Sequence, residues 1–161
     1  MKEFNAPFFQ LYENIFLEYS ELHGTQQALR FLKWLFSRTL EKAYSSFNFT
    51  KGNINHFAKL VRERDENVGL RVELPLVTEN KIIYQFHQDP FPNLKTIINA
   101  GELDNTYIEF KINFLLGNQW SYHTTQHIWD NAPFTEHVIT KKWNEINSTN
   151  TTVTRSLYRC F

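Results

Sequence analysis

The chain has 161 residues with 42% hydrophobic and 16% aromatic content, enough for one globular domain to bury a core without disulfides. Seventeen Lys and Arg residues balance seventeen Asp and Glu residues, so the chain lacks the basic excess of nucleic-acid-binding proteins. Its single cysteine, Cys160, excludes an internal disulfide framework and a cysteine-cluster metal site. No secretory signal is seen, nor an apolar run of the ~18 residues that a spanning helix requires, so we expect a cytoplasmic protein.

The first part of the chain has the periodicity of amphipathic helices. Apolar residues at helical spacing predict a helix over residues 9–22, which ends before Gly24. A second predicted helix, over 26–45, is apolar around more than half of its circumference. We therefore expect it to be buried on several sides, or buried on one side and exposed in a partner interface. Asn53 can cap a third predicted helix, which runs out in the charged residues 62–66.

The period then changes to that of β-strands. Residues 68–76 alternate between apolar and polar, and together with 81–88 they predict a β-hairpin. Pro75 cannot donate to a strand ladder, so it places its strand at an edge or points to the unpaired side. After a proline-rich break, the pattern predicts a short helical turn over 93–99 and a longer helix over 102–116. The predicted apolar stripe of that longer helix consists of Leu103, Tyr107, Phe110 and Phe114.

A second hairpin is predicted next, with strands over 120–129 and 134–143 around the turn Asp130-Asn131-Ala132-Pro133. These elements predict one α+β domain over residues 1–143. Its antiparallel sheet has about four strands, built from two hairpins, and four or more helices cover one face. Residues 144–161 are mostly polar, and we expect them to form a loosely ordered tail.

Histidines on the second hairpin are the first candidates for a polar site. His123 and His127 have a spacing that would share a metal ion on a helix, but on a strand they lie about 13 Å apart. We expect Trp129 to lie opposite Thr135. In that register His127 lies opposite His137, with Cβ atoms about 5 Å apart. The pair suits a proton relay or a weak metal site, and the alternative is ordinary sheet histidines.

Carboxylates supply the remaining acid–base candidates. His87 and Asp89 end the first hairpin, where side chains often face a pocket, although Asp89 can instead simply stabilise the turn before Pro90. Glu136 is a further candidate if the fold brings it to a partner. Glu102 and Asp104 are expected to help start their helix through the helix dipole.

Aromatic residues give a possible ligand pocket. Trp120, Tyr122 and Trp129 can line such a pocket, and the alternative is that they belong to the core. The chain has five glycines and no Gly-rich loop between strand and helix, so it shows no nucleotide motif. No sequence motif implies a cofactor or a metal.

Four segments together resemble the bacterial L-2-amino-thiazoline-4-carboxylic acid hydrolase-like family. That family is similar in plan to 4-vinyl reductase-type ligand-binding domains and to TRAPP-type trafficking subunits. The resemblance covers mainly residues 68 to 143. The segments read DPFPNLK over 89–95, FKINFLLG over 110–117, WSYHTTQHIW over 120–129 and FTEHVI over 134–139.

The resemblance implies an α+β domain with helices on one face of a small antiparallel sheet, and opening of a thiazoline ring by water. Related domains often carry cysteines near the final hairpin. Threonines Thr124, Thr125 and Thr135 stand in that region here, and the only thiol is that of Cys160. This departure puts thiol-based chemistry and metal binding in doubt.

We therefore expect the domain to bind a small, partly apolar molecule between sheet and helices. If it is an enzyme, it is a hydrolase acting on a cyclic C–N bond. In that hypothesis His127 and His137 activate water, and Asp89 or Glu136 orients it or accepts a proton. His87, Trp120, Tyr122 and Trp129 are the expected ligand-binding residues.

Two other functions stay open. One is a non-catalytic interaction module that forms a homodimer through the second helix, with Phe31, Trp34 and Leu35 in the interface. The other is a module that binds a hydrophobic ligand without turning it over.

Overall fold

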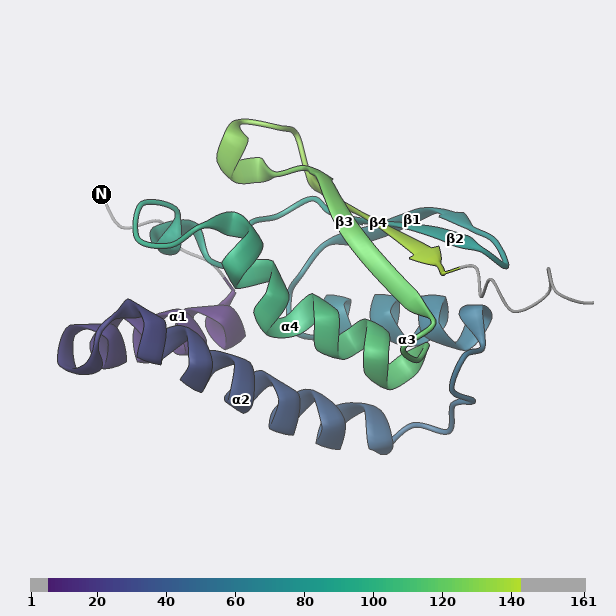
Figure 1. The fold of residues 1–161 in the computed structure, drawn as a ribbon, viewed down its shortest axis with the longest axis horizontal. Helices are drawn as coiled ribbons and strands as arrows, with labels where there is room; N and C mark the ends of the chain where they lie inside the picture. The colour runs from purple at the N-terminus through teal and green to yellow at the C-terminus, as the bar shows by residue number, and fades with distance from the viewer. Residues whose placement is uncertain (1–5, 143–161) are drawn as a thin grey trace, which may run out of the picture.

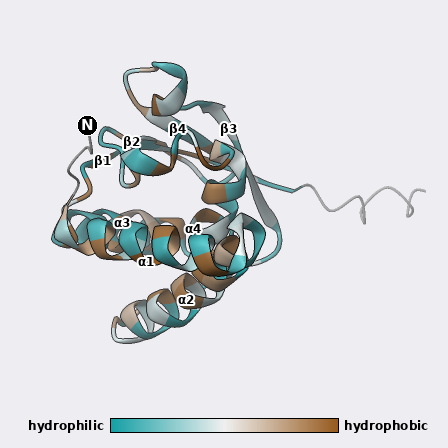
Figure 2. Ribbon diagram, turned by 90° about the vertical axis from the view of Figure 1, so that its left-hand side faces the viewer, coloured by the Kyte–Doolittle hydropathy of each residue, from teal (hydrophilic) through white to brown (hydrophobic). Residues whose placement is uncertain are grey.

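A four-stranded antiparallel sheet and four helices make up the fold (Figure 1). The computed structural model describes residues 6–142. The helices lie on one side of the sheet, and α2 forms the outermost layer (Figure 2). The predicted α+β class is thus confirmed. The helices are α1 (Pro7–His23), α2 (Thr25–Ser45), α3 (Ile54–Asn67) and α4 (Ala100–Leu115).

The sheet joins the two predicted hairpins through their second strands, in the order β1-β2-β4-β3. Pro75 lies in the edge strand β1, where its missing N–H costs no ladder bond, and the pairing with β2 is irregular between Glu73 and Leu76. The strands are β1 (Val72–Val77), β2 (Lys81–Phe86), β3 (Trp120–Gln126) and β4 (Thr135–Lys141).

The first strand begins at Val72 and not at residue 68, because the preceding residues end α3. Gly69 adopts a positive φ of 84°, which a residue with a Cβ rarely adopts. The Val68 N–H donates to Arg64 O, and the Leu70 N–H donates to Asp65 O. The alternating pattern of residues 68–71 therefore belongs to a helix terminus.

Helix α4 is buried on two sides, between α2 and the sheet. The predicted stripe is only partly correct, because Phe110 and Phe114 are half-buried while polar residues point inward. Asn99 caps the helix: its side chain accepts from Gly101 N at 2.8 Å, and Glu102 Oε2 accepts from Asn99 N at 3.4 Å. The buried residues are Leu103, Asp104, Thr106, Tyr107, Ile108, Lys111, Ile112 and Leu115.

Lys111 and Asp65 form a buried ion pair between α4 and α3, with Nζ–Oδ distances of 2.8 and 3.0 Å. The Tyr84 hydroxyl donates to Asp65 and lies 3.1 Å from Lys111 Nζ. Burial, the largest single effect, would lower the pKa of Lys111, but the Asp65 carboxylate and the Tyr44 hydroxyl together outweigh it and raise that pKa. Lys111 is therefore a buried, charged and paired ammonium.

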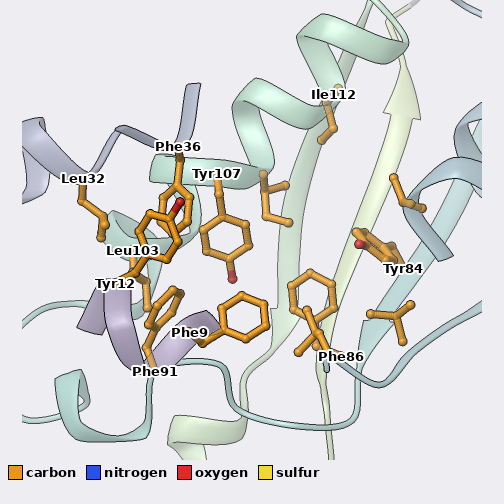
Figure 3. Close-up of a cluster of buried hydrophobic side chains, with 14 of the residues drawn as sticks. Phe9, Tyr12, Leu32, Phe36, Tyr84, Phe86, Phe91, Leu103, Tyr107 and Ile112 are labelled. Carbon is orange, nitrogen blue, oxygen red and sulfur yellow. The ribbon is translucent and has the colours of Figure 1, made fainter. Parts of the chain in front are cut away.

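Aromatic rings line the space between α1, α2 and α4. Phe9, Phe36, Phe91 and Tyr107 gather there (Figure 3), with the Phe9 and Phe91 ring centroids 5.6 Å apart. Phe91 comes from the proline-rich loop that contains the short 3₁₀ helix η1 (Pro92–Leu94). Among the helices of residues 6–142, none combines the length and the hydropathy needed to cross a membrane.

Candidate functional site

A cavity of about 520 Å³ opens between the start of α4, the end of β3 and the short 3₁₀ helix η2 (Ile128–Asp130). This cavity, called the polar cleft below, brings together segments that are about 25 residues apart in the sequence. Its lining includes Gly101 and Asp104 from α4, Thr124 from β3, and His127 and Trp129 around η2.

Asp104 is the central group of the polar cleft. Its side chain is only 1% exposed, and it comes from the second turn of α4. Thr124 Oγ1 donates to Oδ2 at 3.0 Å, and the Tyr107 hydroxyl lies 3.4 Å from Oδ1. Burial raises the pKa of Asp104 to about 6, although both hydroxyl hydrogen bonds oppose that shift. This carboxyl can therefore exchange a proton near neutral pH.

His127 lies beside Asp104 and is a neutral hydrogen-bond donor. It caps η2, and its Nδ1 accepts from Trp129 N at 3.0 Å, so the ring proton of the neutral imidazole lies on Nε2. Burial lowers the pKa of His127, which keeps the ring neutral. Nε2 is 4.0 Å from Asp104 Oδ1. That separation is too long for a direct hydrogen bond and leaves the Nε2–H available to another molecule.

His137 lies on the opposite side of Asp104, on the helix-facing side of β4. Its Nδ1 is 3.0 Å from Thr124 Oγ1 and 4.0 Å from Asp104 Oδ2. Because Thr124 gives its only proton to Asp104, Nδ1 of His137 must be the donor to Thr124. Burial lowers the pKa of His137 to about 3. A hydrogen-bonded chain thus runs from His137 through Thr124 to Asp104.

The two histidines do not lie directly opposite each other as predicted. His137 pairs with Thr124, and the β3–β4 register shifts between Thr124 and Gln126. Trp129 lies in η2 and not in a strand opposite Thr135. Both histidines nevertheless come within 4.0 Å of the same carboxylate. The structure thus brings them together around Asp104.

Asp89 connects the proline-rich loop to η2. It accepts from Phe91 N at 2.8 Å and from Trp129 Nε1 at 2.7 Å. The first bond is the turn stabilisation that the sequence suggested, and the second holds the indole in the wall of the polar cleft. The Trp129 ring in turn meets the His127 ring edge-on, with centroids 5.1 Å apart. Asp89 therefore positions the residues of η2.

Glu136 and His87 lie away from this cluster. Glu136 precedes His137 on β4 and so points to the other face of the sheet. There it accepts hydrogen bonds of 2.7 Å from Gln85 and from Thr125. His87 Nε2 lies 3.5 Å from Glu73 Oε2. The structure does not bring either residue to Asp104.

Trp120 and Tyr122 have structural surroundings. Trp120 is buried where β3 begins. The neighbouring Gln119 carbonyl accepts a hydrogen bond from the Lys142 N–H. The Tyr122 hydroxyl lies 2.5 Å from Asn105 Oδ1, and its ring lies 5.7 Å from that of His137. Of the four expected ligand-binding residues, Trp129 lines the polar cleft.

Sequence reasoning missed Asp104 and Thr124 as site residues. Glu102 is the acidic residue in the first turn of α4, as expected, whereas Asp104 lies in the second turn and is buried. A signal was present: Asp104 and Lys111 are seven residues apart, so they share a helix face with Tyr107 and Ile108. Two charges on a buried face indicate partners or function.

In chemical terms, the polar cleft combines a proton acceptor with a proton donor. Asp104 can take a proton from water, and the His127 Nε2–H can donate to a substrate oxygen or nitrogen. Lys95, also in the lining, adds a positive charge. Within residues 6–142, no group of three or more His, Cys, Asp or Glu side chains is arranged to hold a metal ion.

Comparison with models of known protein families finds no match, and comparison with curated proteins finds none either.

Proposed function

We propose that the polar cleft binds a small polar molecule and that Asp104 is its acid–base group. The observation that carries this proposal is a buried carboxylate that lines an open cavity, has its pKa raised to about 6, and faces a neutral histidine. Carboxylates held near the working pH by burial are typical of general acid–base sites.

The reaction that we propose is hydrolytic opening of a cyclic C–N bond, on a substrate such as 2-amino-thiazoline-4-carboxylate. Asp104 takes a proton from water while the water oxygen adds to the ring carbon of the C=N bond. It then returns that proton to the ring nitrogen. Asp104 then takes the proton of the added hydroxyl and passes it to the same nitrogen as the C–N bond breaks, which leaves a carbonyl and an amine. His127 hydrogen-bonds the polar atoms of the reacting centre, and Lys95 attracts the substrate carboxylate.

The family resemblance supports this choice of reaction, and the geometry supports the roles of the residues. The hypothesis from sequence changes in two respects. Asp104, which lines the cleft, takes the proton-accepting role given to Asp89 or Glu136. The two histidines no longer activate water: His127 hydrogen-bonds the reacting centre, and His137 acts through Thr124 as a positioning residue.

Steady-state hydrolysis of 2-amino-thiazoline-4-carboxylate tests the proposal. We expect Asp104→Asn to lower kcat/KM by about 100-fold or more, since general acid–base groups typically contribute that much. His127→Gln should also lower it. His123→Gln is the matched control, because His123 is exposed on the outer face of β3. A wild-type protein without this activity refutes the reaction, and an unchanged rate in Asp104→Asn refutes the role of Asp104.

An NMR pH titration tests the binding site without any substrate. In the 13C spectrum, the Asp104 carboxyl should titrate near pH 6, and a ligand in the polar cleft should shift that titration. A midpoint near 4 would contradict the acid–base assignment, whatever the substrate.

A second candidate function is a homodimer formed through α2. Trp34 is 55% exposed on this outermost helix, and its ring stacks on Phe31, which stacks on Tyr19. Leu35 beside them is half-buried. An exposed aromatic cluster of this kind supports a contact surface.

Size-exclusion chromatography with light scattering tests the dimer. We expect Trp34→Asp to give a folded monomer, because the substitution is at an exposed position. Lys33→Asp, one residue away and also exposed, is the control. A wild-type protein that is monomeric at high concentration refutes this candidate.

A further inference from the structure

A second cavity, of about 130 Å³, lies among α1, α2, α4 and the end of α3. It is called the apolar cavity below. Most of its lining is aromatic or aliphatic, including Phe9, Phe36, Leu40 and Phe91. An apolar cavity of about 150 Å³ is large enough to hold a benzene molecule. The apolar cavity is slightly smaller than this, so the ligand group that it accommodates is no larger than one aromatic ring or a short acyl chain.

One buried polar group in this lining has no acceptor for its proton among the described residues. Tyr44 is 0% exposed and lines the apolar cavity. Within residues 6–142, its hydroxyl makes no hydrogen bond of ordinary geometry, although it lies near enough to Lys111 to interact with that charge. Burial raises the pKa of Tyr44, so the hydroxyl keeps its proton and remains a donor. Buried polar groups normally have partners, so this donor indicates a missing acceptor.

The charged residues around the apolar cavity indicate that the acceptor carries a negative charge. Arg64, Lys111 and Asp65 all line it, which leaves one net positive charge. Asp65 is fully engaged with Lys111 and with the Tyr84 hydroxyl. Arg64 is half-buried and lies over the Phe47 ring at 5.4 Å. An anionic group on the ligand would therefore meet a positive lining and a free donor.

We propose that the apolar cavity binds a monocarboxylate with a short acyl chain or a single ring. The apolar body lies among Phe9, Phe36 and Phe91, and the carboxylate accepts a hydrogen bond from the Tyr44 hydroxyl near the Arg64 side chain. This site is separate from the polar cleft, and it requires no catalysis there.

Isothermal titration calorimetry of the full chain with octanoate tests the proposal. We expect saturable binding of one octanoate per chain, and weaker binding of octanamide, which has the same length but no charge. Tyr44→Phe should weaken octanoate binding by at least about 10-fold, since it removes a hydrogen bond to a charged group. Tyr19→Phe is the matched control, because Tyr19 lies outside the apolar cavity. This variant should bind octanoate with the same affinity as the wild type.

Filling the apolar cavity is the second test. Ala43→Leu places extra atoms into the lining from α2 and should abolish octanoate binding while circular dichroism shows a folded chain. Should that variant unfold, Tyr44→Phe still decides, because losing an unpaired hydroxyl does not disturb packing. Absence of saturable octanoate binding to the wild type overturns the proposal. So does equal affinity in Tyr44→Phe and Tyr19→Phe.

Discussion

The Asp104→Asn substitution should stabilise the folded protein at alkaline pH, although it should remove activity. Asp104 is buried, and its pKa is raised from 3.8 to about 6. Between those values the folded state binds more protons than the unfolded state, so stability falls as pH rises through this window. The contribution of the ionised carboxylate is therefore a destabilisation. This destabilisation is absent below pH 3.8 and complete above pH 6. Asparagine does not ionise, so the Asp104→Asn variant lacks it.

The size of this effect follows from the shift in pKa. A change from 3.8 to about 6 corresponds to about 3 kcal/mol when Asp104 is ionised in both states. At pH 4 most of the folded and half of the unfolded carboxyls are protonated, so the effect there is below about 1 kcal/mol. Any cost in folding free energy of burying the asparagine side-chain amide does not depend on pH, so it is the same at pH 4 and pH 8. The gain from Asp104→Asn should thus be larger at pH 8 than at pH 4 by about 2 to 3 kcal/mol.

Urea unfolding of wild type and Asp104→Asn at pH 4 and pH 8 measures this difference, because other titrating groups cancel between the two proteins. Glu63→Gln is the control, since Glu63 is exposed, and its effect should change little with pH. A gain for Asp104→Asn that is equal at both pH values would show that Asp104 titrates normally. The acid–base argument for the polar cleft would then lose its basis.

Three further substitutions test other parts of the structure. Lys111→Met should lower the free energy of unfolding by about 3 to 5 kcal/mol, measured by guanidinium unfolding, because it leaves the buried Asp65 carboxylate unpaired. Lys33→Met is its control: it breaks an exposed pair and should cost under about 1 kcal/mol. Asn99→Ala should lower the unfolding free energy by about 1 kcal/mol, measured by urea unfolding, because it removes the cap of α4. His137→Gln should reduce the loss of stability on acidification from pH 6.5 towards 3, measured by urea unfolding across that range. The wild-type loss arises because the lowered pKa of His137 makes the folded state bind fewer protons there.

Local signals were sufficient to predict the elements and the fold class. Asn53 accepts from two backbone N–H groups at the start of α3, as its place before an apolar run suggested. Pro75 lies in an edge strand for the reason inferred from its missing N–H. Each of these features depends on residues that are close in the sequence, which explains why pattern alone could identify them.

The site could not be predicted in the same way, because the sequence pattern does not show where β3 ends. The strand stops at Gln126, His127 caps η2, and the pairing around Thr125 is irregular, so that Thr124 and not His127 faces His137. Glu136 then points to the outer face while its neighbour His137 points to the helices. No local pattern indicates such a bulge, and none shows that Asp104 of α4 lies above this part of the sheet.

The two buried carboxylates, Asp65 on α3 and Asp104 on α4, differ in their partners. Asp65 has an ammonium partner at 2.8 Å, which offsets part of the cost of its burial although burial still raises its pKa, so a structural role is sufficient to explain it. Asp104 receives hydrogen bonds from two hydroxyls, and its nearest histidines, both with lowered pKa, are 4.0 Å away. Without a full countercharge its ionisation is costly, yet it lines a cavity that a small molecule can enter. An apolar residue would stabilise the fold better at that position, and this cost is the reason for our proposal that Asp104 transfers protons in the polar cleft.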